Sequence, residues 1–395
     1  MNANKRRIFF AINARQGAGG QGEFLRQMAY ALDSMPGTAV LSRGCAPSRA
    51  AAVDLPFSGM PEHLLFNSLI RIPVLRGRQD WLTLLSDLEF DRRAAESAGE
   101  PELFDGVMGQ CALTFERLRS GKTARILTAL NTHIDYLYEA LEEECRLTGQ
   151  GTAHFIHPRM RRRALQEIAA ADRIRVNSEW IKQTFVERGV PAAKIKVIRP
   201  SADPSRFYPV RQPDDVFRVL AVASIDPRKG IHYLLQAFTE AKIPNSELLL
   251  IGGTGSRWSR GLLSSFRRKH ANIRHEIFEV NETGAEKLYG PASVLVHPAV
   301  EEGYGLVIAQ ALACGRPVIA TRQSGAAELI AEGKTGFVIE RRSVEQIKDR
   351  LQTLANDAGL RRRMGASASA SVSHLTDENF STEVRNFYGE ILGKA

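Results

Sequence analysis

The chain has 395 residues, of which 44% are hydrophobic and 25% charged, a composition typical of globular proteins and sufficient for two domains. No apolar run approaches the roughly 18 residues that span a bilayer, so the sequence predicts no transmembrane helix. The formal net charge is +9, but no zinc-finger, RRM or KH pattern accompanies it, which argues against nucleic acid as a partner.

The first half of the chain begins with the pattern of a Rossmann-like unit. A strand is predicted over 7–13, a glycine-rich loop over 16–22, a helix over 23–33 and a strand over 38–42. Residues 45–120 carry no pattern that assigns them. The four cysteines lack metal-binding spacing, which favours reduced thiols in the cytoplasm.

The second half is separated from the first by a polar stretch near 200–216 that contains four prolines. From residue 217 onward strands and helices alternate, which predicts a doubly wound parallel α/β sheet. The predicted strands are 217–225, 247–251, 274–278, 293–297, 317–320 and 336–339. The predicted helices include 231–241, 262–270, 306–313, 344–355 and a final one at 379–392.

The most informative segment starts at His297, where a buried strand ends. A loop with Glu302, Gly303 and Gly305 follows, and an apolar helix begins at Leu306. A glycine-bearing loop before a helix N-terminus favours anions, because free N–H groups and the helix dipole face the ligand. A carboxylate there would repel a bare phosphate. The pattern therefore indicates a ligand with a neutral polyol next to a phosphate, such as a sugar nucleotide.

Two further segments follow predicted strands of the same sheet. Arg228 and Lys229 lie in the sequence Asp-Pro-Arg-Lys-Gly, between a strand and a helix, and place cations where a diphosphate would bind. Gly253 lies in a glycine-rich turn after the next strand and is predicted to contact the base or a phosphate.

Together these segments resemble the motifs of retaining glycosyltransferases of the GT-B fold, in family four (group one). The segment from His297 resembles the family's E-x7-E loop, 171–179 its strand and Ser-Glu segment, and 227–230 its phosphate-binding turn. Pro200 to Pro209 resembles its domain-crossing motif. The likeness covers about residues 165–340, and the first 20 residues more weakly.

The resemblance implies two Rossmann-like, doubly wound domains facing each other across a cleft. Residues 1–205 would bind the acceptor, and the C-terminal helix within 376–395 would cross back to this domain. Residues 206–375 would bind the nucleotide-sugar donor. No D-x-D sequence occurs, which favours a reaction that needs no metal and no other cofactor.

For the donor domain, the resemblance implies that Glu302 meets the donor sugar as a catalytic residue. Lys229 and Arg228 would bind the diphosphate, and the loop residues Gly303, Tyr304, Gly305 and Leu306 would contact the donor. Each of these residues could instead be an ordinary turn or core residue with no role in binding. The functional interpretation is favoured because the motifs occur in order.

Two positions depart from the family. Gln310 stands where the second carboxylate of E-x7-E is expected, and an amide offers the ribose hydroxyls one carbonyl oxygen and an amide donor. Ala223-Ser224 replaces a Gly-Arg pair, which weakens the phosphate clamp unless Arg228 substitutes. These departures leave open a catalytically impaired sugar-nucleotide-binding subunit. Sugar-nucleotide epimerases and sugar phosphorylases share the architecture and are further alternatives.

In the first domain, Gly17, Gly19 and Gly20 have the place of the family's glycine-rich loop and would contact the leaving phosphate or the acceptor. His133 is similar in position to a histidine beside the donor sugar, although a histidine at a strand end is often structural. His157 and His297 are interpreted as structural.

The expected partners are a nucleotide sugar and a glycan, lipid-linked or small-molecule acceptor. Basic clusters such as 161–163, 267–269 and 361–363 are singly typical of solvated helix faces. Together they favour attraction to an anionic membrane. The expected location is the cytoplasm, with peripheral contact at the inner face of the membrane.

Overall fold

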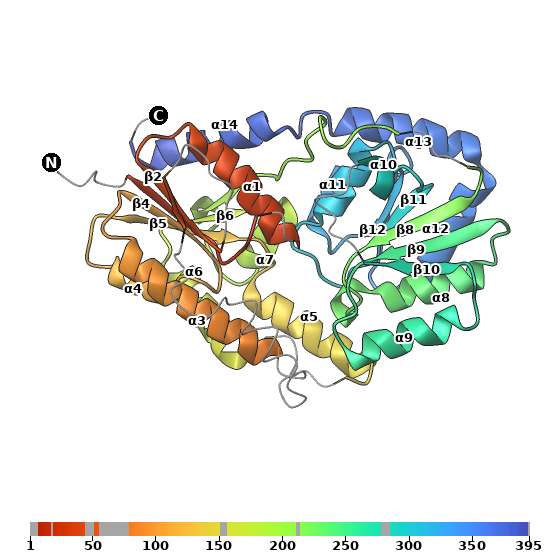
Figure 1. Cartoon of the computed structure of the whole chain (residues 1–395), viewed down its shortest axis with the longest axis horizontal. Helices are drawn as coiled ribbons and strands as arrows, with labels where there is room; N and C mark the ends of the chain where they lie inside the picture. The colour runs from red at the N-terminus through yellow and green to blue at the C-terminus, as the bar shows by residue number, and fades with distance from the viewer. Residues whose placement is uncertain are drawn as a thin grey trace. The chain divides into compact units, whose positions relative to one another are not determined.

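The structure is a computed structural model that describes residues 7–16, 19–43, 51–54, 79–150, 156–210, 214–277 and 285–393. The chain divides into two compact units (Figure 1). Unit 1 comprises Met1–Asn177, Ile181–Arg199 and Asp377–Ala395, and unit 2 comprises Ser178–Trp180 and Pro200–Thr376. The chain thus enters the main part of unit 2 at Pro200, at the start of the proline-containing stretch 200–216.

The described strands of unit 1 form a parallel sheet in the order β3-β2-β1-β4-β5-β6-β7. The strands are β1 Ile8–Ala11, β2 Thr38–Ser42, β3 Ala51–Asp54, β4 Leu103–Val107, β5 Ala124–Ala129, β6 Arg173–Val176 and β7 Ile195–Val197. The helices are α1 Gly19–Asp33, α3 Gln79–Ser97, α4 Ala112–Arg117, α5 Ile134–Leu147, α6 Pro158–Ala170, α7 Glu179–Val186, η2 Ala192–Lys194 and α14 Asp377–Ile391.

Apolar side chains cover both faces of this sheet, because parallel strands are buried on both sides. Ile8 and Phe10 of β1 join the core formed with α1 and α14, whereas Phe9 and Ala11 join the opposite core formed with α3 to α7. The last described helix, α14, therefore packs on the sheet that contains β1, from the start of the chain (Figure 1).

The described strands of unit 2 form a second parallel sheet in the order β10-β9-β8-β11-β12-β13. The strands are β8 Phe217–Val222, β9 Ser246–Ile251, β10 Ile273–Glu276, β11 Val294–His297, β12 Val318–Thr321 and β13 Gly336–Ile339. The helices are η3 Pro227–Lys229, α8 Ile231–Ala241, α9 Arg257–Arg267, α10 Ala285–Leu288, α11 Leu306–Ala313, η5 Gly325–Leu329, α12 Val344–Asn356 and α13 Ala358–Ser371.

The predicted alternation of strands and helices in unit 2 is confirmed. Several elements have the predicted bounds, such as the helices Ile231–Ala241 and Leu306–Ala313. The predicted strand over 217–225 is shorter in the structure and ends at Val222. The predicted helix over 262–270 begins earlier, at Arg257, because Ser256 caps it with a reciprocal pair of hydrogen bonds to Ser259.

Two predictions for unit 1 are corrected. Gly19 and Gly20 were expected in a loop but form the first turn of α1, and Gly17 lies outside the described residues. His133 was expected at a strand end, but β5 ends at Ala129. His133 instead caps α5, and its Nδ1 accepts a hydrogen bond from the backbone N–H of Asp135 at 3.2 Å.

Among the described helices, none has the length and the hydrophobicity that crossing a bilayer requires.

Candidate active site in unit 2

The site is built at the carboxyl ends of β8 and β11. These two strands are neighbours in the sheet, and the chain order reverses between them, which is the position where ligands generally bind in open α/β sheets. The loop after β8 leads through η3 into α8, and the loop after β11 leads into α11. The backbone N–H of Val300 donates to the carbonyl of Arg228 at 2.8 Å and joins the two loops.

Gly230 allows this close approach. Its φ is +64°, and a Cβ at this position would collide with the carbonyl oxygen of Pro298. The start of α8 has no side-chain cap at Gly230, and a helix N-terminus favours an anion through its dipole. Asp226 fixes the preceding turn by accepting the backbone N–H of Lys229 at 3.2 Å.

Four charged side chains meet between the two loops. The Nζ of Lys229 pairs with Oε2 of Glu302. The Nη1 of Arg228 lies 3.1 Å from Oε2 of Glu301 and 3.9 Å from Oε1 of Glu302. The side chain of Glu301 is fully buried, whereas those of Lys229 and Glu302 remain 12% exposed. The side chain of Arg228 is 24% exposed, so a ligand could reach Arg228, Lys229 and Glu302 but not Glu301.

The ionisation of the cluster follows from these contacts. Burial alone would raise the pKa of Glu302, but Lys229, His297 and Arg228 together outweigh burial and hold that pKa well below its usual range. Burial would lower the pKa of Arg228, but Glu302 and Glu301 raise it overall. Glu302 is therefore a carboxylate at neutral pH, and the Arg228 guanidinium stays charged.

A third loop, after β12, holds the Glu302 loop in place. The backbone N–H of Glu302 donates to the carbonyl of Gln323 at 2.9 Å, and that of Ala326 donates to the carbonyl of Tyr304 at 2.7 Å. Gly325 lies so close to the carbonyl of Gly303 that no Cβ would fit. The loop is thus fixed by backbone contacts before any ligand binds.

The other predicted residues of this loop have distinct environments. Gly305, with φ of +83°, precedes the first turn of α11. Tyr304 is only 4% exposed and belongs to the apolar core below the loop, against which Leu306 packs. Gly303 is buried and Gly305 is partly exposed, so Gly305 is the glycine of the loop that a ligand could approach, whereas the ring of Tyr304 contributes to the core.

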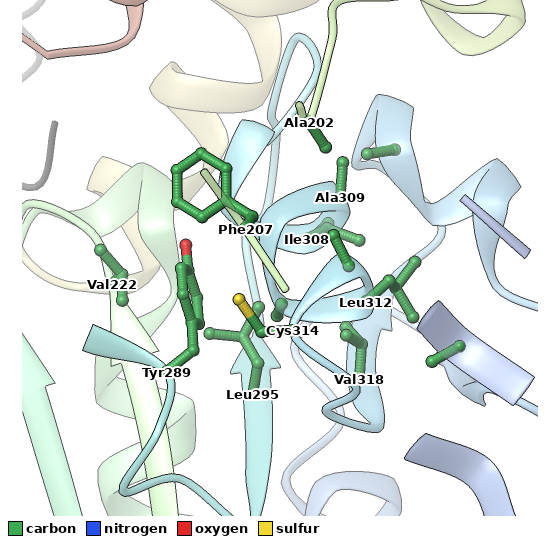
Figure 2. Close-up of a cluster of buried hydrophobic side chains, with 14 of the residues drawn as sticks. Ala202, Phe207, Val222, Tyr289, Leu295, Ile308, Ala309, Leu312, Cys314 and Val318 are labelled. Carbon is green, nitrogen blue, oxygen red and sulfur yellow. The ribbon is translucent and has the colours of Figure 1, made fainter. Parts of the chain in front are cut away.

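Gln310 is buried, and its environment explains how an uncharged residue is accommodated there. Its Oε1 accepts a hydrogen bond from the hydroxyl of Tyr289 at 2.7 Å, and both side chains are at most 2% exposed. Figure 2 shows Tyr289 in an apolar cluster with Phe207 and Cys314. The hydroxyl proton of Tyr289 thus satisfies the amide oxygen of Gln310, which would otherwise be an unpaired polar group that destabilises the apolar core.

Gly253 lies beside the β8 loop, because its carbonyl accepts the backbone N–H of Ile225 at 2.9 Å. The structure thus gathers Gly253, Arg228, Lys229, Glu302 and the Gly303–Leu306 loop at the ends of neighbouring strands of unit 2. His133, Gly19 and Gly20 belong to unit 1, and their predicted roles toward the donor stay predictions.

The sequence interpretation missed two residues of the cluster. Glu301 was not singled out, although a pair of adjacent glutamates opposite an adjacent Arg-Lys pair was a usable signal. His297 was interpreted as structural, yet its Nε2 lies 3.4 Å from Oε2 of Glu302. Its place at the carboxyl end of a central strand was the available clue.

The described residues contain no group of three or more His, Cys, Asp or Glu side chains arranged to hold a metal ion. The expectation of a metal-free reaction remains a prediction.

Solved structures establish the class of fold. The chain superimposes on sucrose-phosphate synthase from Thermosynechococcus elongatus with a TM-score of 0.73 at 21% identity, covering 99% of this chain and 100% of the other. It superimposes on HepE from Anabaena, solved with UDP and glucose, with a TM-score of 0.68 at 16% identity, covering 98% and 100%. The two Rossmann-like units together are the GT-B fold.

The sequence of unit 2 is similar to a known family. Residues 207–370 match the family described as glycosyl transferases group 1. A D-inositol 3-phosphate glycosyltransferase of Kribbella flavida is 28% identical over 225 residues, which are 51% of this chain and 53% of the relative. The chain matches about half the length of such curated relatives.

Proposed function

We propose that the protein is a retaining, metal-independent glycosyltransferase. It would move a sugar from a nucleoside diphosphate sugar to a hydroxyl of a glycan, lipid-linked or small-molecule acceptor. The observation that carries the proposal is the Lys229–Glu302 pair beside the uncapped start of α8. A cation and the positive end of a helix dipole suit a diphosphate, and the adjacent carboxylate suits a sugar.

In the proposed reaction, the bond between the anomeric carbon and the diphosphate oxygen breaks. Lys229 and the N–H groups of α8 stabilise the charge that develops on the leaving diphosphate. The acceptor hydroxyl forms its bond to the anomeric carbon on the same face, and its proton passes to the leaving phosphate. Glu302, ionised and fixed by its loop, would orient the sugar and stabilise positive charge at the anomeric carbon.

HepE was solved with UDP and glucose, which supports a nucleotide and a sugar as ligands of this fold. Peripheral contact with an anionic membrane rests on the net charge of +9 alone. Location in the cytoplasm is likewise part of the proposal.

The test is thermal stabilisation of the purified protein by UDP-, GDP- and ADP-sugars in the presence of EDTA, followed by turnover with the donor that binds. One class of donor should stabilise the protein despite EDTA. Lys229→Ala should weaken donor binding by at least about tenfold, since a hydrogen bond to a charged group contributes about 1.5–3 kcal/mol. Glu302→Gln should retain donor binding and lose turnover by about 100-fold or more.

Lys334→Ala, at an exposed lysine of the same unit, is the matched control and should leave both properties unchanged. Normal turnover in Glu302→Gln, or normal donor binding in Lys229→Ala, would remove that residue from the proposed site. A donor that binds only when a divalent metal is added would overturn the metal-independent reaction.

An impaired sugar-nucleotide-binding subunit is the second candidate, because Gln310 and Ser224 both replace charged residues of the family pattern. In the structure the Oε1 of Gln310 accepts from Tyr289, and the hydroxyl of Ser224 donates to Asp226 at 2.5 Å. An epimerase has no specific observation in its favour.

A further inference from the structure

His297 ends β11 directly below the ion cluster. The residue is 3% exposed, and its Nε2 lies 3.4 Å from the Glu302 oxygen, Oε2, that also pairs with Lys229. Gly305 lies close to the ring, since a Cβ at position 305 would lie 3.6 Å from Nε2. His297 is thus a second nitrogen partner for the same carboxylate oxygen.

Without a ligand, a protonated His297 would add a third positive charge to the cluster. The charged groups that face His297 are Glu302, Lys229 and Arg228, and Arg228 also binds Glu301. The carboxylates of Glu301 and Glu302 therefore already have two cations beside them, and Asp226 also acts on Arg228. Burial lowers the pKa of His297, Glu302 opposes that effect only in part, and the two cations add to it. The imidazole is accordingly neutral in the free protein.

A bound donor changes this balance, and this step rests on the proposed function. A diphosphate at the start of α8 attracts the ammonium of Lys229, which lies immediately before that helix. The Glu302 carboxylate then has two remaining partners. One is Arg228, at 3.9 Å and already bonded to Glu301, and the other is His297, at 3.4 Å. The added negative charge of the diphosphate also favours a protonated imidazole.

We propose that His297 takes up a proton from solvent when the donor diphosphate draws Lys229 away from Glu302, and that the imidazolium then holds the Glu302 carboxylate beside the sugar. His297 is a positioning residue in this account, because it acts on the sugar only through Glu302. Donor binding and proton uptake are coupled, so raising the pH weakens donor binding.

The first measurement uses the wild-type protein and the nucleotide sugar that binds it in the donor panel. An intact nucleotide sugar is chosen because its diphosphate does not titrate near neutral pH. Calorimetry at pH 7 in buffers of different ionisation enthalpy should give an uptake approaching about one proton per donor bound. Affinity should fall with rising pH above about 6.5, by at most about tenfold per unit.

The second measurement assigns the proton. In His297→Gln the amide can still donate to Glu302 but cannot titrate, so proton uptake and the pH dependence of affinity should disappear while donor binding persists. His270→Gln, at a histidine beside Phe266, is the matched control and should take up the proton as the wild type does. If His297→Gln does not fold, the shift of histidine Cε1 resonances in the donor-bound wild type shows whether an imidazole becomes protonated.

The outcomes separate the two proposals. A donor that binds without net proton uptake, or uptake that persists in His297→Gln, overturns the role of His297 and leaves the transferase function intact. Failure of every nucleotide sugar to bind overturns both. Uptake that is present in the wild type and absent in His297→Gln supports the role.

Discussion

Glu301 and Glu302 are adjacent in the chain but have different partners. Glu301 is fully buried against Arg228, whereas Glu302 keeps some exposure and shares Lys229, His297 and Arg228. Removing Arg228 would leave a buried carboxylate without a counter-charge, so part of the importance of Arg228 is structural. The family pattern suggested a phosphate contact for Arg228, and the structure adds this second role.

The buried amide of Gln310 can be tested by a single substitution. In Gln310→Glu, a carboxylate would replace the amide in a buried apolar cluster where Tyr289 is its hydrogen-bond donor. We expect the free protein to lose about 1–3 kcal/mol of unfolding free energy, and turnover to stay within about twofold of the wild type. Chemical denaturation and steady-state turnover provide the two readouts.

Gln166→Glu, at an exposed position of α6, controls for the added charge and should change neither quantity. A large rise in the turnover of Gln310→Glu would instead identify the natural site as impaired.

At the scale of elements, the site depends on how closely η3 and α8 approach the loop after β11. Tight packing of backbone on backbone, rather than a side-chain contact, sets this distance at Gly230 and Pro298. A second close backbone contact of this kind occurs between Gly325 and the carbonyl of Gly303. Both are positions at which the smallest residue is required by a neighbour that is distant in sequence.

Gly230→Ala tests this dependence. The substitution adds a Cβ at positive φ and against the Pro298 carbonyl, so we expect a loss of at least about 1–3 kcal/mol of unfolding free energy and weaker donor binding. Denaturant unfolding and donor titration measure the two effects. Gly261→Ala in α9, where a Cβ meets nothing within 4 Å, should be neutral or stabilising. Equal behaviour of the two variants would contradict the packing argument.

At the scale of the whole molecule, the last helix of the chain completes the first unit. The hydroxyl of Tyr388 in α14 donates to Oδ2 of Asp105 in β4 at 2.5 Å. Asp105 also accepts from Thr128 at 2.6 Å and pairs with the fully buried Arg175 at 3.2 Å. Since an unsatisfied buried carboxylate is costly, this network ties α14 to the sheet of unit 1.

Tyr388→Phe should therefore destabilise unit 1, by about 1–3 kcal/mol, and leave unit 2 unaffected although Tyr388 follows it in sequence. Hydrogen exchange resolved by peptide measures each unit separately. Tyr30→Phe, whose hydroxyl lies 3.3 Å from Glu378 at the surface, should stay within about 0.5 kcal/mol of the wild type. Equal loss of protection in both units would show that they unfold as one.

The sequence determined the alternating strands and helices of unit 2, because local periodicity is encoded by neighbours in the chain. It also indicated Arg228, Lys229 and Glu302 as candidate site residues, because they lie in loops that contain glycine. It did not determine the start of α1, the cap at His133 or the unassigned region around α3 and β4, where local patterns are weak. Tertiary structure alone decided that Glu301 pairs with Arg228, that Tyr289 satisfies Gln310 and that His297 reaches Glu302. The Arg228–Glu301 contact joins loops 73 residues apart, and the packing of β8 beside β11 fixes their distance. His297 and Glu302 are close in sequence, but the fold of the loop between them decides that their side chains meet.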